Sequence, residues 1–457
     1  MSSTIAAIAT PAGRGAIAVI RLSGPDALAL CQRHIDRTPS PRRACFTVFR
    51  VGGEPLDEVV VVYFNAPHSY TGEEVVEISC HGSPYIQQQL LAALIDDGCR
   101  MAEPGEFTRR AFLNGRLNLS QAEAVADLIE STNRGSHRIA LQQLRGGYAA
   151  MLRELRERFV ELTALLELEL DFSEEEVEFA DRRALCELLE TLMERCRRLA
   201  DSFALGNAIR TGVPVAIVGP PNAGKSTLLN RLVGEDRAIV SDQPGTTRDT
   251  IEEPLSLDGI GFRIIDTAGL RHSDEQIEQA GIERSYRAAR NATIILYVID
   301  RAQAGTLSRQ LAALADEVDL TDKQLLVLCN KSDQYRHIPL PDVAALQLPT
   351  GTIQPLILAL SASTGEGLDT LCQHLTEHYR HWGDSDDPVV SNLRHHEALV
   401  HIIDACGQAL RAMRDRQPAD LVAIDLRDAI HHLGTITGEV TPDEVLGTIF
   451  ARFCIGK

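Results

Sequence analysis

The sequence predicts an α/β plus all-α architecture, with an α/β domain at the N-terminus, a helical domain in two halves, and a second α/β domain inserted between them. Over residues 1–117, four short strand patterns, IAAIAT, AIAVIRLSG, EVVVVYFN and EVVEISCHG, alternate with helical ones. Helical periodicity dominates residues 118–210 and returns over residues 379–457, while residues 211–378 contain apolar strands that end in polar loops. Such an insertion requires only that the two ends of the inserted domain lie close together.

A glycine-rich stretch, Val215–Thr227, has the sequence VAIVGPPNAGKST. It matches the pattern G-x-x-x-x-G-K-[ST] of a phosphate-binding loop, with an apolar strand before it and a helix-forming run after it. The backbone N–H groups of such a loop point at the phosphates, and the following helix presents its positive end to them. We expect Lys225 to reach the β- and γ-phosphates and the Ser226 hydroxyl to hold Mg²⁺. The predicted nucleotide contacts are Asn222, Ala223, Gly224, Lys225, Ser226 and Thr227.

Two further motifs follow in the order found in Ras-like domains. The motif GTTRD lies where a switch loop supplies a second Mg²⁺ ligand, for which we expect Thr247. The strand pattern FRIIDTAG then predicts that Asp266 holds the metal through water and that the Gly269 amide senses the γ-phosphate. The predicted nucleotide contacts of these motifs are Gly245, Thr246, Thr247, Asp266, Thr267, Ala268 and Gly269.

The last two motifs concern the base of the nucleotide. The apolar patterns TIILYVID and QLLVLCN are typical of strands buried on both faces, and the second runs into the motif NKSD. The Asp333 carboxylate can accept hydrogen bonds from two neighbouring N–H groups of guanine, a donor pair that adenine lacks. The loop after PLILAL can offer an amide to the guanine oxygen. The predicted base contacts are Asn330, Lys331, Asp333, Ser361, Ala362 and Ser363. Together these motifs predict a GTP-binding domain.

The composition limits the possible classes of protein. At 457 residues the chain is too long for a single core. Its 64 acidic and 45 basic residues give a formal charge of −19, which argues against a chain coated in nucleic acid but is compatible with a local basic patch. Its ten cysteines form no C-x-x-C pair, which favours a reduced, cytoplasmic protein. No apolar run approaches the roughly 20 residues of a membrane span, and we find no secretory or organellar leader.

Some charged residues outside the nucleotide motifs have an ordinary explanation. Arg21, Glu77 and Arg116 lie next to apolar patterns, and from the residues alone we expect them to be solvated or salt-bridged. Ser120 and Glu123 form the pattern of a capping box at the start of the helical domain.

The C-terminal part contains two histidine pairs and a late cysteine. The pairs at 395–396 and 431–432 lack carboxylate or cysteine partners at ligand spacing, which disfavours a metal site. Cys454 lies between Phe453 and Ile455, a setting that favours a buried apolar role, and the chain end does not match a prenylation signal.

The whole chain resembles the tRNA wobble-uridine modification GTPases of the MnmE (TrmE) family. The resemblance rests on TIAAIATPAGRGAIAVIRLSG near the start, PGEFTRRAFLNGRLNLSQAEAVADLIES in the middle and FARFCIGK at the end. The motifs GPPNAGKST, GTTRD, DTAGLR and NKSD complete it. Of these, the start, middle and end motifs are much more specific than the motifs of the GTP-binding domain.

This resemblance implies a cytoplasmic homodimer that joins an FAD-dependent partner of the MnmG type, with the FAD on the partner alone. Together they would build an aminomethyl-type (carboxymethylaminomethyl) group on carbon five of the wobble uridine of certain tRNAs. A tetrahydrofolate derivative, in a 5-formyl or methylene form, would donate the one-carbon unit. The resemblance makes residues 1–117 the folate-binding domain, with Arg21, Glu77, Arg116 and Lys457 as its ligands, and makes Cys454 a functional thiol.

The residue after D-T-A-G needs a separate argument. Ras-like proteins place there a glutamine that orients the attacking water, but this chain has Leu270, which cannot hydrogen-bond. The resemblance implies that K⁺ supplies the missing charge and that Glu278 is the catalytic residue that orients water. From the residues alone, Glu275 and Glu283 are equal candidates for that role. The implied K⁺ ligands are Asn222, Ser241, Gln243 and Thr246, and Ser241 would also contact the nucleotide.

A GTPase of the ribosome-assembly type is the alternative interpretation. Such a protein would use the GTP-binding domain to time its docking on RNA and would perform no one-carbon chemistry. It would be expected to carry a basic RNA-binding module, and the sequence contains no such module.

Overall fold

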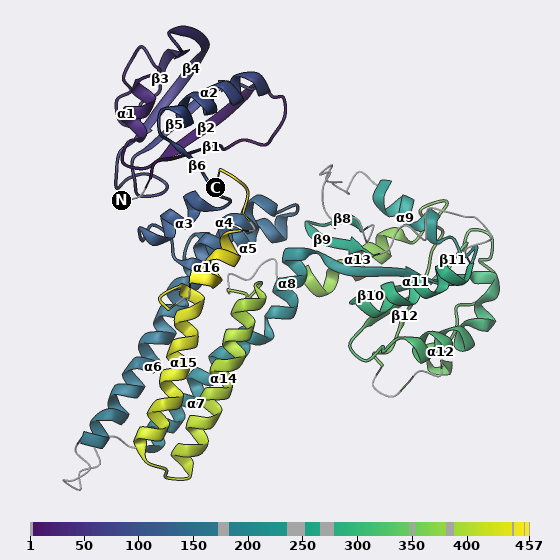
Figure 1. Ribbon diagram of the computed structural model, residues 1–457. Helices are drawn as coiled ribbons and strands as arrows, with labels where there is room; N and C mark the ends of the chain where they lie inside the picture. The colour runs from purple at the N-terminus through teal and green to yellow at the C-terminus, as the bar shows by residue number, and fades with distance from the viewer. Residues whose placement is uncertain are drawn as a thin grey trace. The chain divides into compact units, whose positions relative to one another are not determined.

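The structure, a computed structural model, describes residues 3–171, 182–234, 252–265, 278–346, 349, 352–380, 388–440, 443–451 and 453–456. The chain forms two compact units (Figure 1). The first comprises Met1–Ala126, Gln143–Glu194 and Ala398–Lys457, and the second comprises Asp127–Gln142 and Arg195–Glu397. Segments from both ends of the sequence therefore meet within the first unit.

The N-terminal part of the first unit is built on a six-stranded sheet with the strand order β3-β4-β5-β2-β1-β6. Its strands are β1 (Ile5–Ile8), β2 (Ile17–Ser23), β3 (Cys45–Val51), β4 (Glu54–Phe64), β5 (Val75–His81) and β6 (Arg100–Met101). Neighbouring strands are antiparallel except for the pairing of β1 with β6 at one edge. The predicted strands β1, β2, β4 and β5 are confirmed, whereas β3 and β6 had not been predicted.

The alternation of residues along β2 explains how this sheet is oriented. Ala18, Ile20 and Leu22 are buried in a core shared with the helices α1 (Ala27–Gln32) and α2 (Pro84–Asp96). Because side chains alternate across a strand, Arg21 points to the opposite face. Arg21 is paired in register with Glu77 of β5, so the two charged residues are neighbours on that face.

In the helical part of the first unit, two long helices pack on each other through buried residues with the same spacing. Its helices are α3 (Glu106–Leu113), α4 (Leu119–Glu130), α6 (Gly147–Asp171), α7 (Arg182–Asp201), α14 (Leu393–Arg414), α15 (Ala419–Thr437) and α16 (Asp443–Phe450), of which α4, α7 and α14 continue into the second unit. Residues of α6 and α15 are buried at alternating spacings of three and four, and the two helices pack side by side (Figure 1). These buried residues are Leu152, Leu155, Phe159, Leu162 and Leu166 in α6, and Val422, Leu426, Ala429, Leu433 and Ile436 in α15.

The start of α4 differs from the prediction. The Asn118 side-chain oxygen accepts from the Gln121 backbone N–H (2.8 Å), and the Gln121 side-chain oxygen accepts from the Asn118 N–H (3.1 Å). The reciprocal cap therefore lies two residues before the predicted pair of Ser120 and Glu123. Ser120 instead donates its hydroxyl to Asn118 (2.8 Å).

The second unit is built on a six-stranded sheet with the order β12-β11-β10-β7-β9-β8, parallel except for β8 at the edge. Its strands are β7 (Val213–Val218), β8 (Glu253–Leu257), β9 (Ile260–Ile264), β10 (Ile294–Asp300), β11 (Gln324–Asn330) and β12 (Leu356–Ala359). Its helices are α5 (Arg134–Leu144, its last two residues in the first unit), α8 (Phe203–Thr211), α9 (Lys225–Gly234), η3 (Arg301–Thr306), α11 (Glu278–Asn291), α12 (Leu307–Glu317), η4 (Val343–Ala345) and α13 (Leu368–Arg380).

Helices cover both faces of this second sheet. Val215 and Ile217 of β7 pack in one core with α9 and α13, and the intervening Ala216 packs in another with α11 and α12. All residues of β10 except its last are buried, as are all residues of β11 except its first. The prediction of strands buried on both faces is confirmed. Among the described helices, none is both long and apolar enough to cross a membrane.

Candidate functional site

The phosphate-binding loop connects β7 to α9. The backbone conformation of this loop restricts which residues can occupy two of its positions. Gly219 has φ = 140°, and a Cβ atom there would lie 2.0 Å from the Val298 carbonyl oxygen of β10. Asn222 has φ = 59°, a left-handed conformation that asparagine tolerates better than most residues. The predicted phosphate ligand Lys225 is the first residue of α9, so the loop delivers it to the positive end of that helix.

Lys225 lies against the loop that it is predicted to serve. Its ammonium donates to the Gly219 and Pro220 carbonyl oxygens, both at 2.8 Å. Burial lowers the pKa of Lys225, because the charged form loses hydration there. A phosphate beside this ammonium would oppose that shift. Ser226 and Thr227 follow Lys225 in the first turn of α9, and neither hydroxyl is hydrogen-bonded to a residue that the structure describes.

Asn330 joins the phosphate-binding loop to the predicted base-binding loop. Its amide nitrogen donates to the Ala223 carbonyl (2.7 Å), and its side-chain oxygen accepts from the Ala362 N–H (2.9 Å). A Cβ atom on Gly224 would lie 2.1 Å from the Asn330 amide nitrogen, which explains the glycine. The side chain of Asn330 is buried and thereby fixes the relative positions of loops that are more than a hundred residues apart in sequence.

The remaining base-site residues surround Asn330. Lys331 has φ = 60° and forms an ion pair with Asp300 at the end of β10 (2.7 Å). Asp333 is exposed, and its carboxylate has no hydrogen-bond partner among the described residues. The hydroxyls of Ser361 and Ser363 lie 3.0 Å apart. This part of the predicted guanine site therefore forms one cluster at the carboxyl ends of β10, β11 and β12.

Several predicted ligands lie outside the described residues. These are Ser241, Gln243, Gly245, Thr246, Thr247, Asp266, Thr267, Ala268, Gly269, Leu270 and Lys457. Glu278 is the first residue of α11, but its side chain is also outside the described part of the chain.

A second cluster of charged residues lies on the face of the N-terminal sheet opposite α1 and α2. Arg21 donates to Glu77 (Nε–Oε1, 2.9 Å), and the side chains of this ion pair are only 13% and 29% exposed. The Arg21 guanidinium also donates to the Gly456 carbonyl oxygen (3.2 Å) and lies 5.4 Å from the centroid of the Tyr70 ring. The last residues of the chain therefore lie beside this pair.

Glycine is required where the C-terminal segment reaches the sheet. Gly456 has φ = 98°, and a Cβ atom there would lie 2.5 Å from the Ile8 carbonyl oxygen. The neighbouring Cys454 is exposed, so the expectation of a buried apolar role for it is wrong. This segment is held by its backbone: the Gly105 N–H donates to the Cys454 carbonyl oxygen (3.5 Å). The Cys454 side chain is left exposed.

Arg116 forms no hydrogen bond or ion pair with Arg21 or Glu77. It follows the C-terminal end of α3, and its aliphatic part contacts Gly72, where a Cβ atom would come within 3.2 Å of it. The structure thus brings Arg21, Glu77 and the C-terminal segment together, and places Arg116 beside Gly72.

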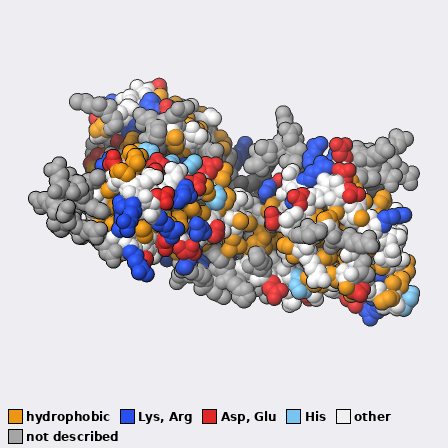
Figure 2. All heavy atoms as spheres, turned by 90° about the horizontal axis from the view of Figure 1, so that it is seen from below, with side chains coloured by type: hydrophobic (Ala, Val, Ile, Leu, Met, Phe, Trp, Pro, Cys, Tyr) orange, Lys and Arg blue, Asp and Glu red, His pale blue; other side chains and the backbone are white. Residues whose placement is uncertain are grey.

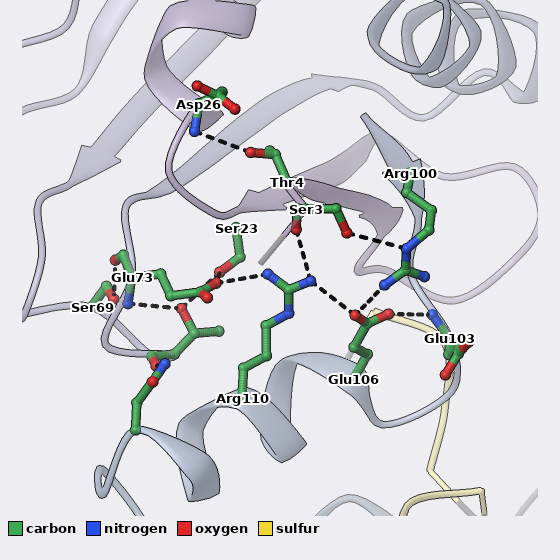
Figure 3. A network of polar contacts seen from close by, with 12 residues as sticks. Ser3, Thr4, Ser23, Asp26, Ser69, Glu73, Arg100, Glu103, Glu106 and Arg110 are labelled. Atoms are coloured by element: carbon green, nitrogen blue, oxygen red, sulfur yellow. Dashed lines mark hydrogen bonds and ion pairs between the residues drawn. The ribbon is translucent and has the colours of Figure 1, made fainter. Parts of the chain in front are cut away.

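A charged network supports that loop (Figure 3). The buried guanidinium of Arg110 donates to Glu73 (3.0 Å), Glu106 (2.9 Å) and the Ser3 carbonyl (2.8 Å). Burial tends to raise the pKa of Glu106, but hydrogen bonds from the Glu103 N–H and from two arginines outweigh it, so the pKa is lowered overall. The Asn114 amide also donates to the Thr71 carbonyl (2.8 Å) and ties the loop to α3.

Replacing Glu106 with glutamine should destabilise the chain by about 1–3 kcal/mol near neutral pH, since hydrogen bonds to a charged group are lost. A lowered folded-state pKa contributes stability above the usual glutamate pKa, and that contribution is lost as pH falls through the folded value. The difference between wild type and Glu106→Gln in urea unfolding should therefore shrink on acidification. A difference that stays constant between pH 7 and pH 3 would contradict this account.

Comparison with known proteins places the chain in a family. A family model described as the MnmE helical domain matches residues 119–454, and one described as the GTP-binding protein TrmE N-terminus matches residues 4–116. The tRNA modification GTPase MnmE of Christiangramia forsetii is 44% identical over 473 residues, covering 100% of both chains. That of Parabacteroides distasonis is 47% identical over 478 residues, again covering 100% of both. This chain belongs to the MnmE family of tRNA modification GTPases.

The MnmE family assignment confirms the predicted resemblance and the class of enzyme, a GTPase in tRNA modification. The phosphate-binding loop could be predicted from its motif alone. A functional role for Arg21 and Glu77, in contrast, was predicted only from the family resemblance. Two residues that contact predicted site residues had not been predicted: Asp300, which pairs with Lys331, and Tyr70, which lies beneath the Arg21 guanidinium. Asp300 ends a buried strand next to β11, a position that could have revealed it, because ligands bind at the carboxyl ends of parallel strands. Tyr70 lies in a loop without any recognisable pattern.

Proposed function

We propose that the chain is a GTP-hydrolysing enzyme that installs an aminomethyl-type (carboxymethylaminomethyl) group on carbon five of the tRNA wobble uridine, together with an FAD-dependent MnmG-type partner. The observation that carries the GTP-dependent part is the bridge through Asn330, which joins the phosphate-binding and base-binding loops into one site. Mass spectrometry of the wobble nucleoside tests the proposal, after incubation of unmodified tRNA with the chain, its FAD-containing partner, GTP, a methylene-tetrahydrofolate, and ammonia or glycine as the amine. An unchanged uridine in the complete mixture would refute it.

The residues around the nucleotide have separable tasks. Lys225 binds the β/γ-phosphates, Asp333 selects guanine, and the Ser226 hydroxyl, unengaged by any described residue, is suited to hold Mg²⁺. Mg²⁺ neutralises charge on the phosphates. The Asn222 side chain, presented by a left-handed backbone, supplies an oxygen suited to K⁺ in the same loop. Thr247 and Asp266 complete the proposed magnesium site.

The first unit is proposed to bind the tetrahydrofolate derivative. Arg21 and Glu77 offer a cation beside a carboxylate, and the Tyr70 ring offers an aromatic surface to a flat heterocycle. Lys457 is the next residue in the sequence after Gly456, whose carbonyl oxygen accepts a hydrogen bond from Arg21. Arg116 belongs to the proposed folate set by family resemblance alone.

Removal of Lys457 should weaken folate binding about tenfold or more, since a charge-assisted hydrogen bond contributes roughly 1.5–3 kcal/mol. GTP turnover should remain nearly unchanged. Calorimetry with 5-formyltetrahydrofolate measures the first quantity and phosphate release the second. If the intact chain shows no folate affinity, the folate proposal fails and the ribosome-assembly alternative gains support.

The assembly is proposed to be a cytoplasmic homodimer that also binds the MnmG-type partner. Membership of a tRNA modification family disfavours the ribosome-assembly alternative, because the N-terminal and helical family models both match. The two functions are separated by the nucleoside assay described above, since an assembly GTPase leaves the wobble uridine unmodified.

A further inference from the structure

Lysine is rare in this chain, so the few positions that carry it are informative. Of the 45 lysine and arginine residues, only four are lysines: Lys225, Lys323, Lys331 and Lys457. Figure 2 shows basic side chains interspersed with acidic ones on the face that it presents, and the composition makes nearly all of the chain's basic side chains arginines. Lysine differs from arginine in carrying a compact ammonium group on a flexible four-carbon stem. A lysine in such a chain marks a position that uses one of these properties.

Lys331 is held at both ends of its side chain. Its backbone has φ = 60° and directly follows Asn330, whose buried side chain joins the phosphate-binding loop to the base-binding loop. Its ammonium pairs with Asp300 (Nζ–Oδ2, 2.7 Å), and the side chains of Asp300 and Lys331 are only 15% and 34% exposed. Asp300 lies in register with Asn330 in the parallel pairing of β10 with β11. The Lys331 stem therefore runs from the end of β11 to the end of β10, at the carboxyl edge of the sheet, where ligands bind in sheets of this kind.

The Asp300 carboxylate is itself fixed by a second contact. While its Oδ2 accepts from Lys331, its Oδ1 accepts from the Ala302 backbone N–H (2.9 Å) and so caps η3. The next residue, Arg301, donates to the Ile338 carbonyl oxygen (2.8 Å), in the loop that follows Asp333. The end of β10 thus supports both the Lys331 side chain and the loop that continues from the base site.

A restrained lysine stem favours nucleotide binding, because it offers an apolar surface with little conformational freedom left to lose. A free lysine side chain loses much rotamer entropy when it is fixed in one conformation. Here the Asp300 ion pair restrains the Lys331 stem in the folded chain, so that cost does not fall on nucleotide binding. Asp333, two residues further along the same loop, is exposed and is predicted to read the edge of guanine. The stem is therefore placed to cover one face of the same ring.

We propose that Asp300 is a positioning residue of the GTP site, which holds the Lys331 stem against one face of the guanine ring while Asp333 reads the edge of the ring. Asp300 acts through Lys331 and not on the nucleotide itself. The inference rests on the proposed guanine site at Asn330, Lys331 and Asp333, and adds the residue that prepares its lysine. Because the face of the ring is common to purines, Asp300 contributes to affinity but not to the choice between purine bases.

Asp300→Asn in the full-length chain tests the inference. Asparagine caps helices about as well as aspartate, so this change keeps the η3 cap and removes the charge that faces Lys331. Calorimetry measures the affinities for GTP and for inosine triphosphate, which lacks one of the two N–H groups that Asp333 is predicted to accept. We expect both affinities to fall about tenfold, the lower end for a lost charge-assisted hydrogen bond, with their ratio unchanged.

Two further variants isolate the contact between Asp300 and Lys331. Lys331→Met keeps an unbranched stem but loses the ion pair, and should show the same loss of GTP affinity as Asp300→Asn. The double variant should show no further loss, because both changes remove one interaction. Asp342→Asn is the matched control: the Asp342 carboxylate caps η4 through the Ala344 N–H (3.0 Å) in the same way, but pairs with no lysine among the described residues. It should bind both nucleotides as the wild type does.

Wild-type GTP affinity in Asp300→Asn would overturn the inference. So would a roughly hundredfold loss in the double variant, since additive losses show that the two residues act separately. A changed ratio of GTP to inosine triphosphate affinity in Asp300→Asn would also overturn it, because the effect would then belong to Asp333. Urea unfolding without nucleotide checks folding, and if Asp300→Asn does not fold, wild-type GTP affinity in Lys331→Met overturns the inference. Failure of the proposed guanine site is distinguishable, because Asp333→Asn would then bind GTP normally.

Discussion

Asp333→Asn should lower the affinity for GTP by roughly 3–6 kcal/mol, because two hydrogen bonds to a charged acceptor are lost at about 1.5–3 kcal/mol each. The Asp333 carboxylate is exposed and has no partner among the described residues, so it is available to the base. The asparagine amide would place a donor against a guanine donor, whereas xanthine offers an oxygen at that position. Affinity for xanthosine triphosphate should therefore rise as that for GTP falls. Calorimetry with both nucleotides measures the exchange.

Asp316→Asn provides the matched control, since it removes the same charge from an exposed carboxylate on α12. It should leave both affinities unchanged. Equal GTP affinity in wild type and Asp333→Asn would show that the base site lies elsewhere. A loss of GTP affinity without any gain for xanthosine triphosphate would indicate that the substitution distorts the loop after β11, which contains Asn330, Lys331 and Asp333.

The second unit was largely predictable from sequence because its strands and loops follow local rules. Continuous apolar runs predicted β10 and β11, and the glycines at 219 and 224 stand where backbone crowding leaves no room for a side chain. The role of Asn330 was only partly predicted. Sequence motifs indicate that it contributes to the base site, but its bonds to Ala223 and Ala362 depend on how three loops meet in space.

The first unit was less predictable because its contacts join distant segments. From the residues alone, Arg21 and Glu77 were expected to be solvated or salt-bridged, and they do form an ion pair. That Arg21 pairs with Glu77 follows from the register of β2 and β5. That Arg21 also donates to the Gly456 carbonyl follows from the path of the C-terminal segment. Neither can be deduced from the local sequence. The edge strand β6 is two residues long, which is too short to show the alternation of apolar and polar residues that predicts a strand. The exposure of Cys454 likewise depends on its backbone being held at Gly105 and Gly456.

GTP hydrolysis should depend on K⁺ and should not be supported by Na⁺ at matched ionic strength. Leu270 cannot orient water, and in the proposal K⁺ held by Asn222 supplies charge near the β/γ-phosphates, where an arginine would otherwise act. K⁺ would also reduce the phosphate repulsion between two GTP-binding domains that meet face to face, so their pairing should follow the same ion. Asn222→Gly removes the side-chain oxygen yet permits the observed φ of 59°, so it should abolish the difference between the two salts. Equal rates of phosphate release by the wild type in KCl and NaCl would refute the cation mechanism.

The water-orienting residue is tested in the same assay with Glu278→Ala, Glu275→Ala and Glu283→Ala. Family resemblance favours Glu278, the first residue of α11, whereas Glu283 lies exposed one turn further along that helix. Glu278→Ala should keep GTP affinity but lose about two to three orders of magnitude in turnover, as when a single catalytic stabiliser is removed. The other two variants should retain most of their turnover. Because binding and turnover are measured separately, a fall in GTP affinity would reveal a misfolded loop, and a turnover defect confined to Glu275→Ala or Glu283→Ala would transfer the role to that residue.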